Sequence, residues 1–125
     1  MAPRGIKPVF TGNFSANLSD IQTFLGKDGA RAFDRLFEHL VEDIVPMLCR
    51  FPLSGRSFLQ RSIRSNEAQA LAQKLRERLR AGDDLREFIA DDYLILYLVR
   101  AKQIVFLSIR HHRQLTFDLK RFWRD

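Results

Sequence analysis

The chain has 125 residues, of which 46% are hydrophobic and 29% charged, and this composition is ordinary for one soluble domain with a buried core. No apolar run approaches the roughly 18 residues that a membrane-spanning helix needs, and the first residues contain no apolar segment of signal-peptide length. We therefore expect a single domain over residues 1-125, located in the cytoplasm and without a membrane partner. The single cysteine, Cys49, excludes an internal disulfide and is expected to fill the core.

The net charge of +6 is concentrated in two segments of the chain. Residues 50–80 hold eight Lys and Arg against two Asp and Glu, and residues 100–125 hold seven against two. The residues between them, 81–99, are acidic. If the two basic segments converge on one face they would attract a polyanion, and otherwise they are separate solvated surfaces. Charge by itself leaves both alternatives open.

The first third of the chain predicts a short strand at residues 8–11 and then a helix. Thr11 or Asn13 can cap the start of this helix, and Gly26 is expected to end it. The apolar side chains of the helix recur at steps of four, three and four residues: Phe14, Leu18, Ile21 and Leu25. This spacing places them on one stripe that faces a core.

A second helix is expected to begin at Asp28, which can act as its N-cap. Its apolar stripe continues the same pattern, with Phe33, Phe37, Leu40, Ile44 and Leu48. Pro46 removes a hydrogen bond to Glu42, so it must kink the helix or begin a separate last turn. Because the joint between the two helices is short, they are expected to form an antiparallel hairpin.

The middle of the chain predicts a turn, a connector and a further helix. Residues 51–56 are rich in turn formers, and residues 57–64 are a basic connector. A third helix is expected over residues 66–81, with Asn66 as its cap and Gly82 as its stop. Its remaining surface would carry Lys74, Arg76, Arg78 and Arg80. Such a face is usually only solvated, and a nucleic-acid role is the alternative.

Three strands are expected to follow, at residues 85–90, 93–99 and 104–109. The joints at residues 91–92 and 100–103 are too short to connect parallel strands, so the three strands form an antiparallel meander. We therefore predict an α+β fold, with the N-terminal short strand and helical hairpin packed on a twisted antiparallel β-meander and an additional helix inserted before the meander. The apolar residues from 115 to 123 are expected to form an edge strand that runs into a short helix.

The last strand ends in Arg110-His111-His112-Arg113, which combines the residue types that RNA cleavage needs. Attack by a 2′-hydroxyl requires a base, an acid and cations around the phosphate, and His and Arg supply them. Adjacent side chains of a strand point to opposite faces, so Arg110 pairs with His112 and His111 with Arg113. The neighbouring histidines lack further ligands at a suitable spacing, so neither a metal nor another cofactor is expected.

One face of the last strand carries three apolar residues, Val105, Leu107 and Ile109. We expect this face to pack on the helices, which would bring His111 to the rim of the core. Arg110 and His112 would then be the exposed pair. An alternative role for His111 is to bond a buried backbone group and hold the C-terminal tail.

Four stretches recur together in one known family: Phe51-Pro52-Leu53-Ser54-Gly55-Arg56, Arg86-Glu87-Phe88-Ile89, Tyr93-Leu94-Ile95-Leu96-Tyr97-Leu98-Val99 and Ile109-Arg110-His111-His112-Arg113. With the short first strand and the helical hairpin, they resemble the RelE/ParE family of bacterial type II toxins. The resemblance covers most of the chain. Residues 57–82 depart from it, because they hold an additional helix where these toxins usually have a short connection.

The resemblance implies a toxin that inhibits growth and is neutralised by a small antitoxin, encoded next to it, whose flexible segment wraps around the toxin. Operator DNA would be contacted only through this antitoxin. RelE-like members cut messenger RNA in the ribosomal decoding site, whereas ParE-like members block DNA gyrase without being enzymes. RelE-like nucleases tend to place an arginine directly after the first tyrosine of the central strand, and here that residue is Leu94.

We therefore favour a ParE-like toxin that binds DNA gyrase. The first alternative is a RelE-like, ribosome-dependent endoribonuclease that works on mRNA without a metal and uses Arg110, His112 and Arg113. The second alternative is a nucleic-acid-binding module with no toxic role. The residues expected to bind the target or a nucleic acid are Arg56, Arg61, Arg64, Lys120 and Arg121.

Overall fold

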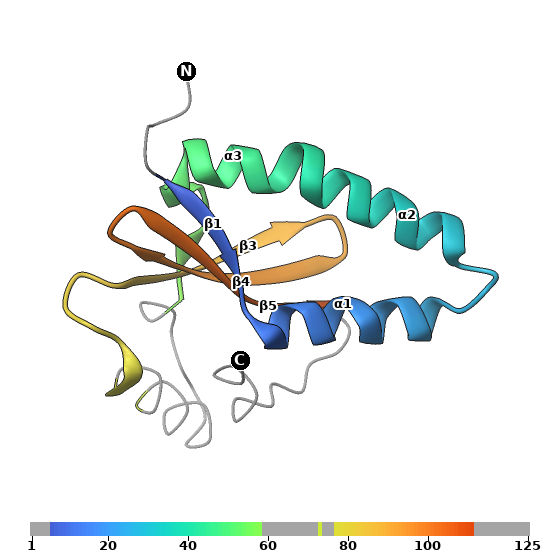
Figure 1. The fold of residues 1–125 in the computed structure, drawn as a ribbon, viewed down its shortest axis with the longest axis horizontal. Helices are drawn as coiled ribbons and strands as arrows, with labels where there is room; N and C mark the ends of the chain where they lie inside the picture. Colours follow the sequence, from blue (N-terminus) through green and yellow to red (C-terminus); the bar gives the residue numbers. More distant parts are fainter. Residues whose placement is uncertain (1–5, 59–72, 74–76, 112–125) are drawn as a thin grey trace.

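The computed structural model describes residues 6–58, 73 and 77–111, and it has the predicted α+β fold (Figure 1). In chain order the elements are β1 (Lys7–Phe10), α1 (Gly12–Leu25), α2 (Ala30–His39), the π-helical segment η1 (Leu40–Ile44), α3 (Val45–Arg50), the 3-10 turn η2 (Pro52–Ser54), β2 (Arg56–Ser57), β3 (Asp84–Ala90), β4 (Tyr93–Arg100) and β5 (Gln103–His111). Within these ranges, no helix combines the length and the apolar character needed to cross a membrane.

The sheet has five strands in the order β1-β5-β4-β3-β2. Strands β3, β4 and β5 form the predicted antiparallel meander, with tight turns at residues 91–92 and 101–102. β1 lies parallel to β5 and pairs only with its first half, residues 103–106. The sequence predicts this first strand but not its direction, so the sheet is mixed rather than wholly antiparallel.

Helix α1 begins and ends where the sequence predicts. The Thr11 hydroxyl accepts a hydrogen bond from the Phe14 N–H at 3.1 Å, which satisfies one of the free donors in the first turn. At the other end, Gly26 adopts a φ of 65°, a left-handed value that glycine reaches without a steric cost. The chain then turns back into α2, and Figure 1 shows the two helices as the arms of the predicted hairpin.

The prediction that Asp28 caps the second helix is wrong. The N-cap is Gly29, and no side chain caps this helix start. The Gly29 N–H bonds to the carbonyl of Leu25 at 3.1 Å, which closes the turn between the helices. A Cβ on residue 29 would lie only 2.6 Å from the Leu25 oxygen, so the tightness of the turn reserves this position for glycine.

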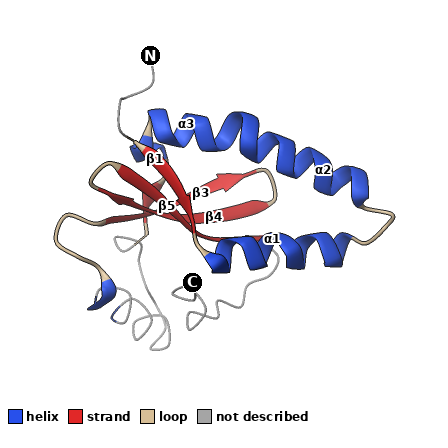
Figure 2. Cartoon of the chain, in the orientation of Figure 1, coloured by secondary structure: helices blue, strands red, loops and turns tan. Residues whose placement is uncertain are grey.

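Pro46 lies at the start of α3, where the sequence predicts a kink or a separate last turn, and it is accommodated by a change of helical type. The five residues of η1 precede α3, and the Val45 N–H bonds to the carbonyl of Leu40, five residues back. Pro46 has no N–H to donate, and the wider π turn just before it allows the chain to continue as a helix into α3 (Figure 2).

Half-buried Cys49 packs against the core from α3, and burial raises the pKa of its thiol.

Arg56 and Ser57 differ from the prediction, which placed them in a turn and a connector. They form the edge strand β2, antiparallel to β3, with Arg56 opposite Glu87 and Ser57 opposite Arg86. Most of the predicted helix 66–81 and all of the predicted C-terminal strand and helix lie outside the residues that the structure describes. Of the described residues in this range, 73, 77 and 78 are helical, but residues 79–81 are not, so the prediction that this helix extends to Gly82 is wrong.

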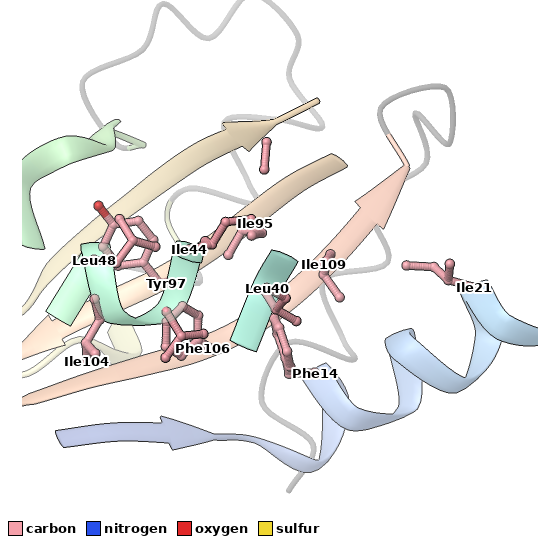
Figure 3. Close-up of a cluster of buried hydrophobic side chains, with 12 residues drawn as sticks. Phe14, Ile21, Leu40, Ile44, Leu48, Ile95, Tyr97, Ile104, Phe106 and Ile109 are labelled. Carbon is pink, nitrogen blue, oxygen red and sulfur yellow. The ribbon is translucent and has the colours of Figure 1, made fainter. Parts of the chain in front are cut away.

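The two helical arms cover one face of the sheet and enclose the main core. Figure 3 shows this cluster between the helices and strands β4 and β5. Its buried members are Phe14, Ile21, Leu40, Ile44, Val45, Leu48, Ala90, Ile95, Tyr97, Ile104, Phe106 and Ile109. The predicted apolar stripes of both helices therefore face the same sheet surface.

The opposite face of the sheet is also buried over part of its area. A second cluster consists of Leu85, Leu96, Leu98 and Leu107. Phe58 and Leu79 pack against it from the two ends of the inserted region. Because both faces are covered, β4 is apolar on both sides, as the sequence of this central strand predicts.

Candidate functional site

A β-bulge in β5 sets the orientation of the cationic end of this strand. Leu96 of β4 lies opposite Ser108, whereas the next residue, Tyr97, lies opposite Phe106. Leu107 is therefore an extra residue on β5, and the alternation of faces shifts by one position there.

The predicted apolar face of β5 is wrong because of this bulge. Ile109 packs in the main core beneath the helices, together with Phe106. Val105 and Leu107 instead lie on the opposite face, in or against the second cluster. A sequence pattern of period two cannot show this, since the bulge interrupts the period between Phe106 and Ile109.

Beyond the bulge, the two described residues of the cationic motif point to opposite faces. His111 follows Ile109 on the helix side, where its ring meets the ring of Tyr93 edge-on with centroids 5.4 Å apart. Tyr93 packs against the main core, and burial is the main cause that raises the pKa of its hydroxyl. The rim position expected for His111 is observed, but its physical basis is the bulge rather than a regular apolar face.

Arg110 lies on the other face, in a row of residues that crosses three strands. Its cross-strand partner is Leu94, and the partner of Leu94 on β3 is Ile89. Arg110 and Leu94 are half-buried, whereas Ile89 is 56% exposed. We call these three residues the β5-end surface. It offers one guanidinium beside two aliphatic side chains, a combination that suits contact with another macromolecule.

The edge of β5 next to this surface is held by the start of α1. β1 stops opposite Phe106, and from there side chains of α1 replace a neighbouring strand. The Asn13 amide donates to the carbonyl of Leu107 at 2.9 Å, and the side-chain oxygen of Asn17 accepts from the Ile109 N–H at 3.1 Å. The sequence offers Asn13 only as a possible helix cap, and it has no local signal for Asn17.

Arg56 is not brought together with Arg110. Its strand β2 is separated from β5 by β3 and β4, which corresponds to roughly 14 Å at ordinary strand spacing. Its Nε lies 2.8 Å from Oε1 of Glu87, a carboxylate whose side chain is 0% exposed. Arg56 therefore compensates a buried charge. The other predicted site residues lie outside the described ranges: Arg61, Arg64, His112, Arg113, Lys120 and Arg121.

Three of the four sequence motifs meet in one structural unit around the 51–56 turn. The Tyr97 hydroxyl donates to the carbonyl of Pro52 at 2.8 Å and accepts from the Gly55 N–H at 2.9 Å. Arg86 donates through one nitrogen to the carbonyls of Gly55 at 2.6 Å and Leu53 at 3.3 Å. Burial raises the pKa of Tyr97, so its hydroxyl remains a donor. These motif residues serve to fix the turn.

The RelE/ParE resemblance implies a helical hairpin packed on a twisted antiparallel sheet, and the structure has this hairpin on a mixed five-stranded sheet. The family model for the ParE toxin of the type II toxin–antitoxin system parDE matches residues 9–116, which is most of the chain. The chain therefore belongs to the ParE toxin family, and the resemblance seen in its motifs is confirmed. A search of the curated proteins finds no match. The family implies a cognate antitoxin as the partner of this toxin.

Proposed function

We propose that this ParE-family toxin inhibits growth by binding DNA gyrase in the cytoplasm, without catalysing a reaction itself. The surface that we assign to gyrase is the β5-end surface of Ile89, Leu94 and Arg110. The cognate antitoxin then neutralises the toxin by covering this surface, and operator DNA is contacted only through the antitoxin. The family match supports the toxin class, and the position of Arg110 supports the mode of action.

The observation that carries the proposal is the apolar neighbourhood of Arg110 on the face of the sheet away from the helices. Cleavage of RNA through the 2′-hydroxyl needs a base, an acid and cations around a single phosphate. The bulge decides that Arg110 takes the face away from the helices, whereas His111 takes the helix side, against the Tyr93 ring. The cross-strand neighbour of Arg110 is apolar Leu94 rather than a second cation. The described end of β5 is thus better suited to binding than to catalysis.

The chemistry of the β5-end surface fits a protein target. Arginine is enriched among the residues that carry most of the binding energy at protein interfaces, and the contacts around such a residue contribute by excluding water. Ile89 is exposed on the edge-side strand β3 and Arg110 comes from β5, so the surface spans the width of the meander.

The proposal is tested by two assays run in parallel on the purified toxin. One follows supercoiling of relaxed plasmid by gyrase, and the other follows messenger RNA in a translating extract. We expect wild-type toxin to inhibit supercoiling and to leave the RNA intact. Arg110→Ala is expected to weaken inhibition by about tenfold or more, as for removal of an interface anchor. Arg110→Lys retains the charge, so its inhibition of supercoiling should be intermediate between that of wild type and that of Arg110→Ala.

Arg35→Ala is the matched control, because Arg35 is exposed on α2, away from β5. Its inhibition should equal that of wild type. RNA cleavage without an effect on gyrase would reject the proposal in favour of the RelE-like nuclease, and His112→Ala should then abolish cleavage while ribosome binding remains. If expression without antitoxin left growth unaffected, the chain would instead be a non-toxic nucleic-acid-binding module.

A further inference from the structure

Two asparagines at the start of α1 are buried in a place where polar side chains are costly. Asn13 is 4% exposed and Asn17 is 6% exposed. An amide removed from water must recover its hydrogen bonds inside the protein. Here the partners are backbone groups of β5, the carbonyl of Leu107 and the N–H of Ile109. The two amides also bond to each other, with Asn13 Nδ2 3.4 Å from Asn17 Oδ1.

The hydrogen bonds of Asn13 and Asn17 reach β5 at the bulge and just beyond it. In a regular strand, successive carbonyls point to opposite edges. Here the Thr11 hydroxyl lies within hydrogen-bond distance of two successive carbonyls, at 3.1 Å from Phe106 and 3.2 Å from Leu107. Both carbonyls therefore face α1, which is the signature of the extra residue. Asn13 then donates to the second of these carbonyls, that of Leu107, and Asn17 accepts from the next N–H on the same edge, that of Ile109.

We propose that Asn13 and Asn17 are positioning residues that determine which face of the sheet presents Arg110. A one-residue change in the register of β5 would exchange the faces of Arg110 and His111. Arg110 would then point toward the helices, and the β5-end surface would lose its guanidinium. This inference depends on the proposed function, in which Arg110 contacts the target. The asparagines act through β5 and do not touch the target themselves.

The chain offers a matched pair of substitutions. Asn13→Asp replaces the amide donor by a carboxylate that faces the Leu107 carbonyl, so the bond is lost and the bulge is disfavoured. Asn17→Asp keeps an oxygen that accepts from both Ile109 and Asn13, so the bulge is retained. Asn13→Ala removes the donor without adding a charge, and it serves as the second variant if Asn13→Asp fails to fold.

The first measurement is the register itself, by amide hydrogen exchange and cross-strand nuclear Overhauser contacts in the full chain. In Asn13→Ala we expect exchange of the Ile109 amide to rise by about tenfold, and the contact between Leu96 and Ser108 to weaken. Asn17→Asp should preserve both. An unchanged register in Asn13→Ala would overturn the inference, whatever the target of the toxin is.

The second measurement is a double-mutant cycle on growth inhibition with Arg110→Ala. If Asn13 acts through Arg110, Asn13→Ala should lower potency in the wild-type background and have no further effect when Arg110 is already alanine. Equal losses in both backgrounds would show a purely structural role and overturn the inference. Because growth is the readout, failure to inhibit gyrase would reject the proposed target but leave this coupling measurable.

Discussion

The guanidinium of Arg100 holds the carboxylate of Asp83 through two hydrogen bonds, with Nε 3.0 Å from Oδ1 and Nη2 2.8 Å from Oδ2. The carboxylate also accepts from the Arg80 N–H at 2.7 Å, and the Asp83 side chain is only 2% exposed. This pair ties the chain that enters the meander to the end of β4. The hydrogen bond from Arg100 is the main cause that holds the pKa of Asp83 below its ordinary value.

Asp83→Asn is expected to lower the free energy of unfolding by about 1.5–3 kcal/mol at pH 7, as for loss of a charge-assisted hydrogen bond. Because the pKa of Asp83 is lower in the folded than in the unfolded state, its contribution is complete above the unfolded pKa of about 3.9 and is lost as the pH falls through the folded pKa. Urea unfolding at neutral and acid pH should show the difference from wild type shrinking below about pH 4.

Asp20→Asn is the control for this series, since Asp20 is exposed on α1. It should change stability little at either pH. A deficit of Asp83→Asn that stayed constant in acid would contradict an electrostatic origin.

Tyr97→Phe is expected to destabilise the fold by about 2 kcal/mol, because it leaves the Gly55 N–H and the Pro52 carbonyl without the hydroxyl that joins them. Tyr93→Phe is the matched control. The substitution retains the ring contact with His111, and within the described part of the chain the Tyr93 hydroxyl makes no hydrogen bond that would be lost. Chemical denaturation of both variants measures the difference. Equal losses would mean that the turn does not depend on the Tyr97 hydroxyl.

Gly55→Ala is expected to destabilise the fold by roughly 1–3 kcal/mol through overpacking. The backbone angle is not the cause, since Gly55 has a φ of −75° that any residue adopts. A Cβ there would instead lie 2.5 Å from the Glu87 carbonyl and 2.6 Å from the Tyr97 hydroxyl. In the Tyr97→Phe background part of the crowding is removed, so the cost of Gly55→Ala should be smaller. Full additivity of the two substitutions in denaturation would contradict this explanation.

Arg56→Ala is expected to act on stability rather than on target binding. It deprives buried Glu87 of an ion-pair partner, but the Arg56 side chain is 61% exposed and solvent screens the pair. We therefore expect a loss of about 1–2 kcal/mol, below the value for a fully buried pair. Adding Glu87→Gln should recover part of it. Growth inhibition that disappears while stability is unchanged would instead assign Arg56 to the target surface.

Much of the fold could be predicted because its signals are local. Thr11 is a good cap, Gly26 a good stop, and the turn at residues 91–92 is too short for anything but a hairpin. The error at Asp28 has a different cause, since the choice of Gly29 depends on how closely the chain approaches Leu25. Predicting that approach requires the packing of both helices.

The orientation of the side chains in the candidate site was harder to predict from the sequence. The cationic motif at the end of β5 is visible in the sequence, but the faces of Arg110 and His111 depend on the bulge at Leu107. The groups that hold the bulge come from α1, and Asn13 bonds a carbonyl 94 positions further along the chain. No pattern within β5 itself indicates this partner.

The amino-acid sequence by itself determined the helical hairpin, the antiparallel meander and the family, because apolar spacing, caps and joint lengths are properties of neighbouring residues. Only the tertiary structure decided that β1 lies parallel on β5, that α1 completes the edge where β1 stops, and that Arg110 faces away from the helices. The physical reason is that backbone groups of an edge strand bond to whatever lies beside them, and their partners are chosen by the packing of the whole domain.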